Sequence, residues 1–161
     1  MSRSGLVVVA FCIGLLAVVA LALATLQFGV CTTTPSDQNV EAAIKVFIDE
    51  NDTILKLAIG LVVFAFAGLS GLRTELAVTW YARILLLLTC TLGLVGAYGS
   101  IVWRHMLAQV RLDGCPSWVL DKAMQVPFVL SFYAVAMAVA TLGILGAHLA
   151  LSAVNRNVIA R

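Results

Sequence analysis

Four long apolar runs, separated by short polar segments, dominate this chain of 161 residues. A helix needs about 20 mostly apolar residues to cross a bilayer core of about 30 Å, and it satisfies its own backbone hydrogen bonds in lipid. The pattern therefore predicts an all-α protein: an integral membrane four-helix bundle in a single transmembrane domain. The predicted spans cover about residues 5–27, 53–72, 84–103 and 126–154, with outer loops at 28–52 and 104–125.

The first run has some features of a secretory signal peptide. Arg3 supplies a short basic segment before it, and Ala22-Leu23-Ala24 resembles a cleavage site. We expect this run to be retained as a signal anchor and to form the first transmembrane helix.

The segment after Pro35 has the spacing of an amphipathic helix. Its apolar residues follow the i, i+3, i+4, i+7, i+8 pattern, and charged residues occupy the opposite face. We predict a short amphipathic helix in the first outer loop. This helix either lies flat on the membrane surface or extends the second span outward and packs its apolar face on a partner. The apolar residues are Val40, Ala43, Ile44, Phe47 and Ile48.

Asn51-Asp52-Thr53 matches the N-glycosylation sequon. The sequon directly adjoins the second predicted span, too close to the bilayer for modification. We therefore interpret it as a coincidence.

Composition supports a location in lipid. Hydrophobic residues make up 62% of the chain and charged residues only 11%, whereas soluble domains carry about 25% charged residues. The net charge of +2 is small and no basic stripe is present, so nucleic acid is not an expected partner.

Charged residues give a limited signal for orientation. Five Lys or Arg residues lie at the two termini and the second connection, and five lie in the first and third connections with their flanks. The second connection and the C-terminal tail are nevertheless short and basic, which favours the cytoplasm for both termini. We expect a multi-pass protein of the plasma membrane.

Cys31 and Cys115 are both predicted on the outer side, where an oxidising environment permits a disulfide. They are the candidate pair, and the alternative is two free thiols near the interface. Cys12 and Cys90 lie inside predicted spans, where a thiol usually packs as a small hydrophobe.

Small residues recur along one face of each span. Lipid tails are as apolar as leucine, so transmembrane helices associate through close packing at such residues. The stripes either build only the bundle itself, or one of them, on the fourth span, faces lipid or another subunit. The candidate packing residues are Gly14, Gly60, Gly68, Gly71, Gly93, Gly96, Ala136, Ala140, Gly143 and Ala147.

Candidate chemistry is sparse. No Asp, Glu or Arg lies near the middle of a predicted span, where ionisable residues usually mark transport paths or proton relays. His105 and His148 are predicted near opposite membrane surfaces, which disfavours one haem between them within the chain and leaves a haem shared with a partner subunit as the alternative. No two cysteines have the C-x-x-C spacing, and nothing matches a Ser/His/Asp set or a P-loop. We expect neither enzyme activity nor a metal or other cofactor.

The turn after the second span resembles an element of tetraspanins. Gly68-Leu69-Ser70-Gly71-Leu72-Arg73-Thr74-Glu75 is similar to the Gly-Cys-Cys-Gly-x-x-x-Glu sequence with which tetraspanins turn toward their third helix, although both cysteines are replaced. The large tetraspanin loop with its Cys-Cys-Gly motif is absent. The short third connection and the Ala82-Arg83 start of the third span are claudin-like, but the first loop lacks the tryptophans and paired cysteines of claudins. The resemblance implies a membrane organiser that binds through its two outer loops.

The sequence thus favours a non-enzymatic four-span membrane scaffold or accessory subunit, acting through lateral helix packing and outer-loop contacts. Its partners would be the lipid bilayer and other membrane proteins or another copy of itself. An oligomeric channel or transport subunit ranks second, because Gln27, Thr89, Thr91 and Ser100 do not share one helical face. A small subunit of a respiratory or other redox membrane complex ranks third.

Overall fold

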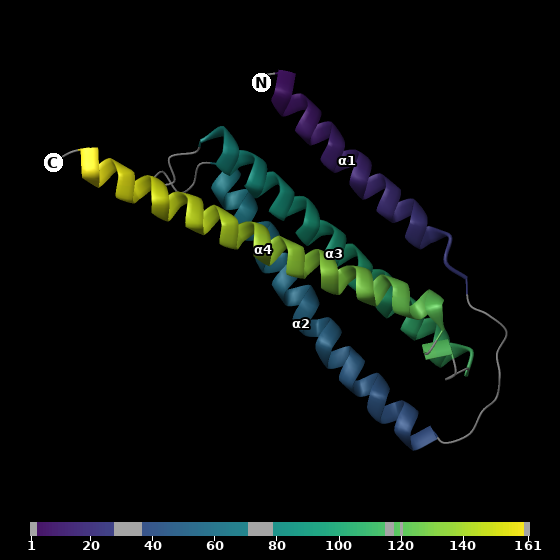
Figure 1. Cartoon of the computed structure of the whole chain (residues 1–161). Coiled ribbons are helices and arrows are strands. Elements are labelled where there is room, and N and C mark those ends of the chain that lie inside the picture. Colours follow the sequence, from purple (N-terminus) through teal and green to yellow (C-terminus); the bar gives the residue numbers. More distant parts are fainter. Residues whose placement is uncertain (1–2, 28–36, 71–78, 115–117, 120, 160–161) are drawn as a thin grey trace.

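The computed structural model of the protein describes residues 3–27, 37–70, 79–114, 118–119 and 121–159, and this part forms four long helices and no strand. Consecutive helices run in opposite directions, so that α1 begins and α4 ends at the same end of the molecule (Figure 1). We call this the terminal end and the opposite one the distal end. The all-α prediction is confirmed. The helices are α1 (Arg3–Ala24), α2 (Asp37–Leu69), α3 (Trp80–Leu112) and α4 (Lys122–Ile159).

Three of the helices are long and apolar enough to cross a membrane, in their portions Glu41–Leu69, Trp80–Asp113 and Lys122–Leu151. Their outward faces expose large apolar side chains such as Phe66 and Met137, which a soluble monomer rarely does over so wide a surface. The composition and these helices identify a multi-pass membrane protein. In α1, the described side chains form a shorter apolar stretch, Ile13–Leu23, and its role as a span stays a prediction.

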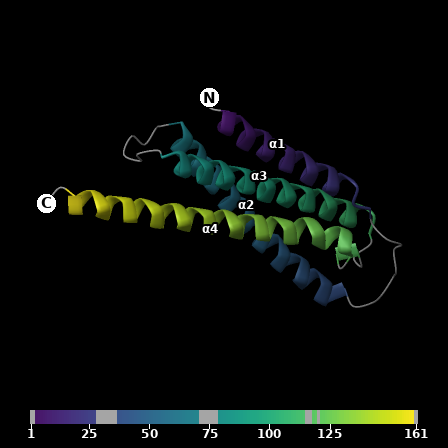
Figure 2. The same ribbon diagram turned by 45° about the horizontal axis from the view of Figure 1, so that its top comes forward.

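α3 lies at the centre of the molecule. It packs along both α2 and α4, and α1 lies beside it, away from α4 in both views (Figures 1 and 2). α2 and α4 touch each other less, because they cross and α2 diverges toward the distal end. Three clusters of buried apolar residues, at the distal end, the middle and the terminal end, hold the helices together.

The predicted short outer helix is not a separate element, because it forms the first half of α2. Ile44 is buried there, and Phe47 and Ile48 pack partly buried beside it, against the distal parts of α3 and α4. The segment therefore extends the second span outward, and its apolar face packs on helices of the same chain. The side chain of Val40 lies outside the described residues.

The described helix starts follow local capping rules. Thr79 precedes α3 with an extended backbone, and its hydroxyl accepts a hydrogen bond from the Ala82 amide at 3.2 Å. The Asp121 carboxylate accepts one from the Ala123 amide at 3.0 Å. α4 begins at Lys122, earlier than the fourth predicted span, and Pro127 lies inside this helix. Because Pro127 has no amide hydrogen, it cannot donate a hydrogen bond to the carbonyl four residues earlier in the helix.

Candidate functional site

Three glycines of α3 allow close approach of the neighbouring helices. A Cβ atom at Gly93 would lie 2.8 Å from Cγ2 of Val62 in α2 and 3.2 Å from the carbonyl oxygen of Ala58. A Cβ atom at Gly96 would lie 2.8 Å from Cγ2 of Val135 in α4. The bare backbone of α3 is therefore the surface on which α2 and α4 pack, as small residues permit in membrane helices.

Gly99 marks the tightest contact between α3 and α4. A Cβ atom there would overlap the Ser131 side chain and lie 3.0 Å from the carbonyl oxygen of Pro127. The Ser131 hydroxyl donates to that carbonyl oxygen at 2.7 Å, so this polar group is satisfied within α4. The site is closed to solvent, because Ser131 is fully buried.

The buried threonine hydroxyls pair with one another or with their own helix, whereas the buried Ser100 hydroxyl has no hydrogen-bond partner among the described residues. Thr89 in α3 and Thr141 in α4 are both buried, and their hydroxyls share a hydrogen bond of 2.8 Å. Each hydroxyl also lies within hydrogen-bond distance of a backbone carbonyl one turn earlier, that of Leu85 for Thr89 and of Ala138 for Thr141. Because each hydroxyl has one proton, one of them donates to its carbonyl and accepts the hydrogen bond that the other donates. These polar groups fasten α3 to α4, and they are not aligned along an open path.

A polar contact joins α2 to α3 nearer the distal end. Asn51 and Ser100 are both fully buried, and the Asn51 amide donates to the Ser100 carbonyl oxygen at 3.4 Å. Beside it, Asp52 forms an ion pair with Arg104, and both side chains are roughly half-exposed. Because Asn51 is enclosed between helices, the folded chain offers its sequon no access to a glycosylating enzyme.

The small-residue stripe of α4 faces outward. Ala136, Ala140, Gly143 and Ala147 are all exposed, and a Cβ atom at Gly143 would have nothing within 4 Å. The stripe therefore does not take part in packing within the chain. Its position contrasts with that of the α3 glycines, which neighbouring helices cover.

The other predicted packing residues differ in their surroundings. A Cβ atom at Gly68 would lie 3.0 Å from Cδ1 of Leu86, whereas Cβ atoms at Gly14 and Gly60 would meet nothing within 4 Å. Gly71, Cys31 and Cys115 lie outside the described residues, so the disulfide stays a prediction. Cys90 is half-buried against the cluster at the terminal end.

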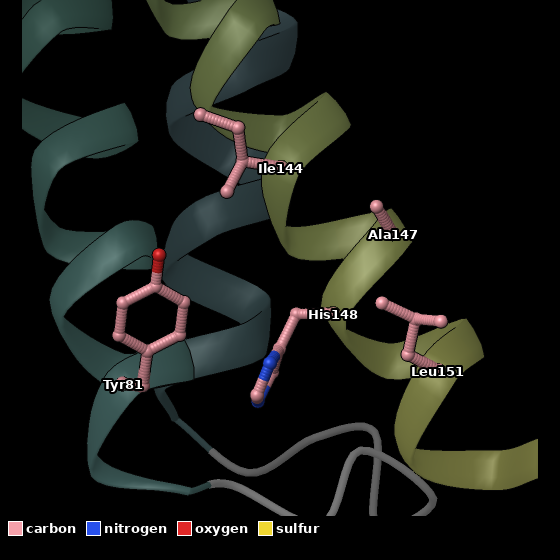
Figure 3. A pocket seen from close by; sticks show the side chains of 5 residues that line it. All are labelled: Tyr81, Ile144, Ala147, His148 and Leu151. Carbon is pink, nitrogen blue, oxygen red and sulfur yellow. The ribbon is translucent and has the colours of Figure 1, made fainter.

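An open groove of about 460 Å³ lies between α3 and α4 at the terminal end. Its polar side chains, Tyr81 and His148, face each other with ring centroids 5.0 Å apart and ring planes at 61°. In Figure 3 the His148 ring lies between the two helices, and the Tyr81 hydroxyl points toward Ile144. The remaining lining is apolar, from Ile144, Ala147 and Leu151.

A second cavity, of about 220 Å³, lies at the distal end between α2, α3 and α4. Aromatic rings surround it: Phe128 contacts Phe47 edge-on at a centroid distance of 5.4 Å and Trp103 at 5.7 Å. Gln125 is a polar residue at its edge. The cavity is thus apolar and part of the packing of the distal cluster.

The two histidines lie at opposite ends of the bundle. His105 is exposed in the distal part of α3 and contacts Gln109 at 3.5 Å, whereas His148 contacts Tyr81 in the first turn of α3. Residues 81–105 of α3 rise about 36 Å at 1.5 Å per residue, so one haem cannot join the two rings. Within the described residues, no three His, Cys, Asp or Glu side chains gather as a metal site.

Sequence reasoning missed several residues that the structure brings together. Gly99 lies three residues after Gly96 in sequence. The sequence of a single span does not reveal which of its glycines contacts the backbone of another helix. The Thr89–Thr141 and Asn51–Ser100 pairs join different helices, so periodicity within one helix could not find them. Tyr81 had a usable signal, since an aromatic residue beside Trp80 at a span end is typical of a membrane interface.

No family model, no curated protein and no solved structure matches this chain.

Proposed function

We propose that this protein is a non-enzymatic four-span membrane scaffold or accessory subunit that binds other membrane proteins, or another copy of itself, through the outward face of α4. The observation that carries this proposal is the contrast between two sets of small residues. The glycines of α3 are covered by α2 and α4, while the α4 stripe from Ala136 to Ala147 is left open.

Energetics support a lateral contact at this stripe. Association of helices in lipid depends on close packing, interhelical hydrogen bonds and lipid entropy rather than on the hydrophobic effect. A helix face without protruding side chains lets a second helix approach along its whole length. Larger exposed side chains flank the stripe, including Phe132, Val139 and Ile144, so an incoming helix would meet a shallow channel with apolar edges.

The interior supports a scaffold more than a channel. Buried hydroxyls such as Thr89 and Thr141 bond to each other or to backbone carbonyls. The Asp52–Arg104 pair sits at the edge of the apolar part of α3, where Trp103 ends the predicted span. A conducting path needs polar groups directed toward a common water-filled axis, and the described residues do not supply one within a single chain.

The test is substitution of the stripe with a matched control. Gly143→Leu places a large side chain on the outward face of α4, and we expect it to reduce the larger species recovered after cross-linking in native membranes at least about tenfold, a change of about 1.4 kcal/mol. Gly60→Leu is the control, because Gly60 is equally open but lies on α2. A wild-type protein that is monomeric and cross-links to nothing would refute the proposal, as would equal losses in both variants.

A further inference from the structure

The groove between α3 and α4 at the terminal end combines features that point to a ligand. It is a shallow groove of about 460 Å³, open to the surroundings over most of its extent. Its lining is mostly apolar, and its polar groups are the Tyr81 phenol, whose hydroxyl points toward Ile144, and the His148 imidazole. We infer that the groove binds an anionic phospholipid, with Tyr81 and His148 holding the phosphate of the headgroup and an acyl chain lying against Ile144 and Leu151.

The hydrogen-bonding capacity of the groove supports this inference. Neither the Tyr81 hydroxyl nor the His148 ring forms a hydrogen bond with another described residue, and their own contact is between ring faces and edges. A neutral imidazole still carries one N–H donor, and a phenol carries one O–H donor. Polar side chains at the depth of the headgroups meet water as well as lipid, so their donors are available to a headgroup. A phosphate ester supplies acceptors for both donors.

The depth of the groove matches that of headgroups. Tyr81 follows Trp80 in the first turn of α3, and both side chains are nearly half-exposed. Trp and Tyr are enriched where acyl chains meet headgroups. Residues 80–103 of α3 rise about 35 Å, close to the thickness of a bilayer core. The half-exposed Trp80 fits one boundary of that core, whereas Trp103 is buried in the distal cluster. His148 lies level with Tyr81 and hence at the same boundary.

Charge favours an anionic lipid at this end. By sequence, the two chain ends and the second connection with its flanks contain five arginines and only one acidic residue, Glu75. Among these arginines the described side chain is that of Arg83, which is exposed in the first turn of α3. The other seven acidic residues lie in the first and third connections. Basic residues near a membrane surface attract anionic lipids, by about 1 kcal/mol each. This inference does not depend on the lateral contact proposed for α4.

Lipid binding to the whole purified protein in mild detergent tests the inference. We expect native mass spectrometry to show bound phosphatidylglycerol at occupancy well above that of phosphatidylcholine. The double variant Tyr81→Phe with His148→Leu removes both donors and keeps the ring of residue 81, and we expect at least about a tenfold loss of bound phosphatidylglycerol, equal to about 1.4 kcal/mol. Tyr98→Phe and His105→Leu are matched controls, because both side chains are exposed on α3 away from the groove.

A second variant keeps the donors and fills the groove. Leu151→Trp, at a groove residue outside the stripe from Ala136 to Ala147, should also abolish the preference for phosphatidylglycerol while leaving helix content, measured by circular dichroism, unchanged. Equal occupancy in the wild-type protein and the double variant would overturn the inference, as would equal binding of both lipids. Displacement of the lipid by inorganic phosphate alone would assign the groove to free phosphate and overturn the lipid assignment. Retained cross-linking in the double variant separates this result from the test of the α4 contact.

Discussion

At the scale of single residues, the environment of each glycine decides its role. Gly99 and Gly143 have the same side chain and both lie inside helices, yet one faces a neighbouring backbone and the other faces open space. A glycine within a helix costs about 0.5–1 kcal/mol relative to alanine. Inside the bundle, close packing offsets that destabilisation. The fold therefore requires the covered glycines of α3.

This difference predicts opposite effects of the same substitution. Gly99→Ala should lower the stability of the folded protein by about 1–3 kcal/mol, because the added methyl group meets Ser131 and the Pro127 carbonyl. Gly143→Ala should be neutral or stabilising, since its methyl group meets nothing and alanine favours the helix. Thermal unfolding in detergent, followed by circular dichroism, measures both. A Gly99→Ala protein as stable as Gly143→Ala would show that α3 and α4 are not in close contact there.

At the scale of elements, the sequence predicted the three confirmed apolar helices because their spans are long and almost free of charge. It left open whether the segment before the second span lies on the membrane surface or extends that span, and the structure shows one unbroken α2 from Asp37 to Leu69. The apolar face around Ile44 has the same periodicity whether it packs on lipid or on protein. Its packing on protein depends on the distal parts of α3 and α4, whose position the periodicity of α2 does not reveal. The contacts at Gly99, Asn51 and Tyr81 escaped prediction for the same reason, since each joins helices distant in sequence.

The distal half of α2 should therefore depend on packing rather than on lipid. Ile44→Ala removes a buried side chain from the distal cluster and should cost about 2–3 kcal/mol. It should also raise the rate of amide hydrogen exchange in residues 41–50. Val46→Ala is the control, because Val46 is 56% exposed on the same turn of α2. If this half of α2 lay on the membrane surface, the two substitutions would change exchange equally.

At the scale of the whole molecule, alternation of helix direction sets the relation between the two chain ends. α1 begins and α4 ends at the terminal end (Figure 1), while Leu112 is 86% exposed at the distal end.

If α1 crosses the bilayer like the other three helices, epitope tags fused to the two chain ends should both be accessible from the same side of sealed membrane vesicles. A thiol reagent that cannot cross membranes should reach Leu112→Cys only from the other side, in a background without the native cysteines. The expectation of cytoplasmic termini further requires the tags to face the cytoplasm, because the basic second connection and tail favour that side. Tags on opposite sides would mean that α1 lies along α3 without crossing, and the protein would then have three spans.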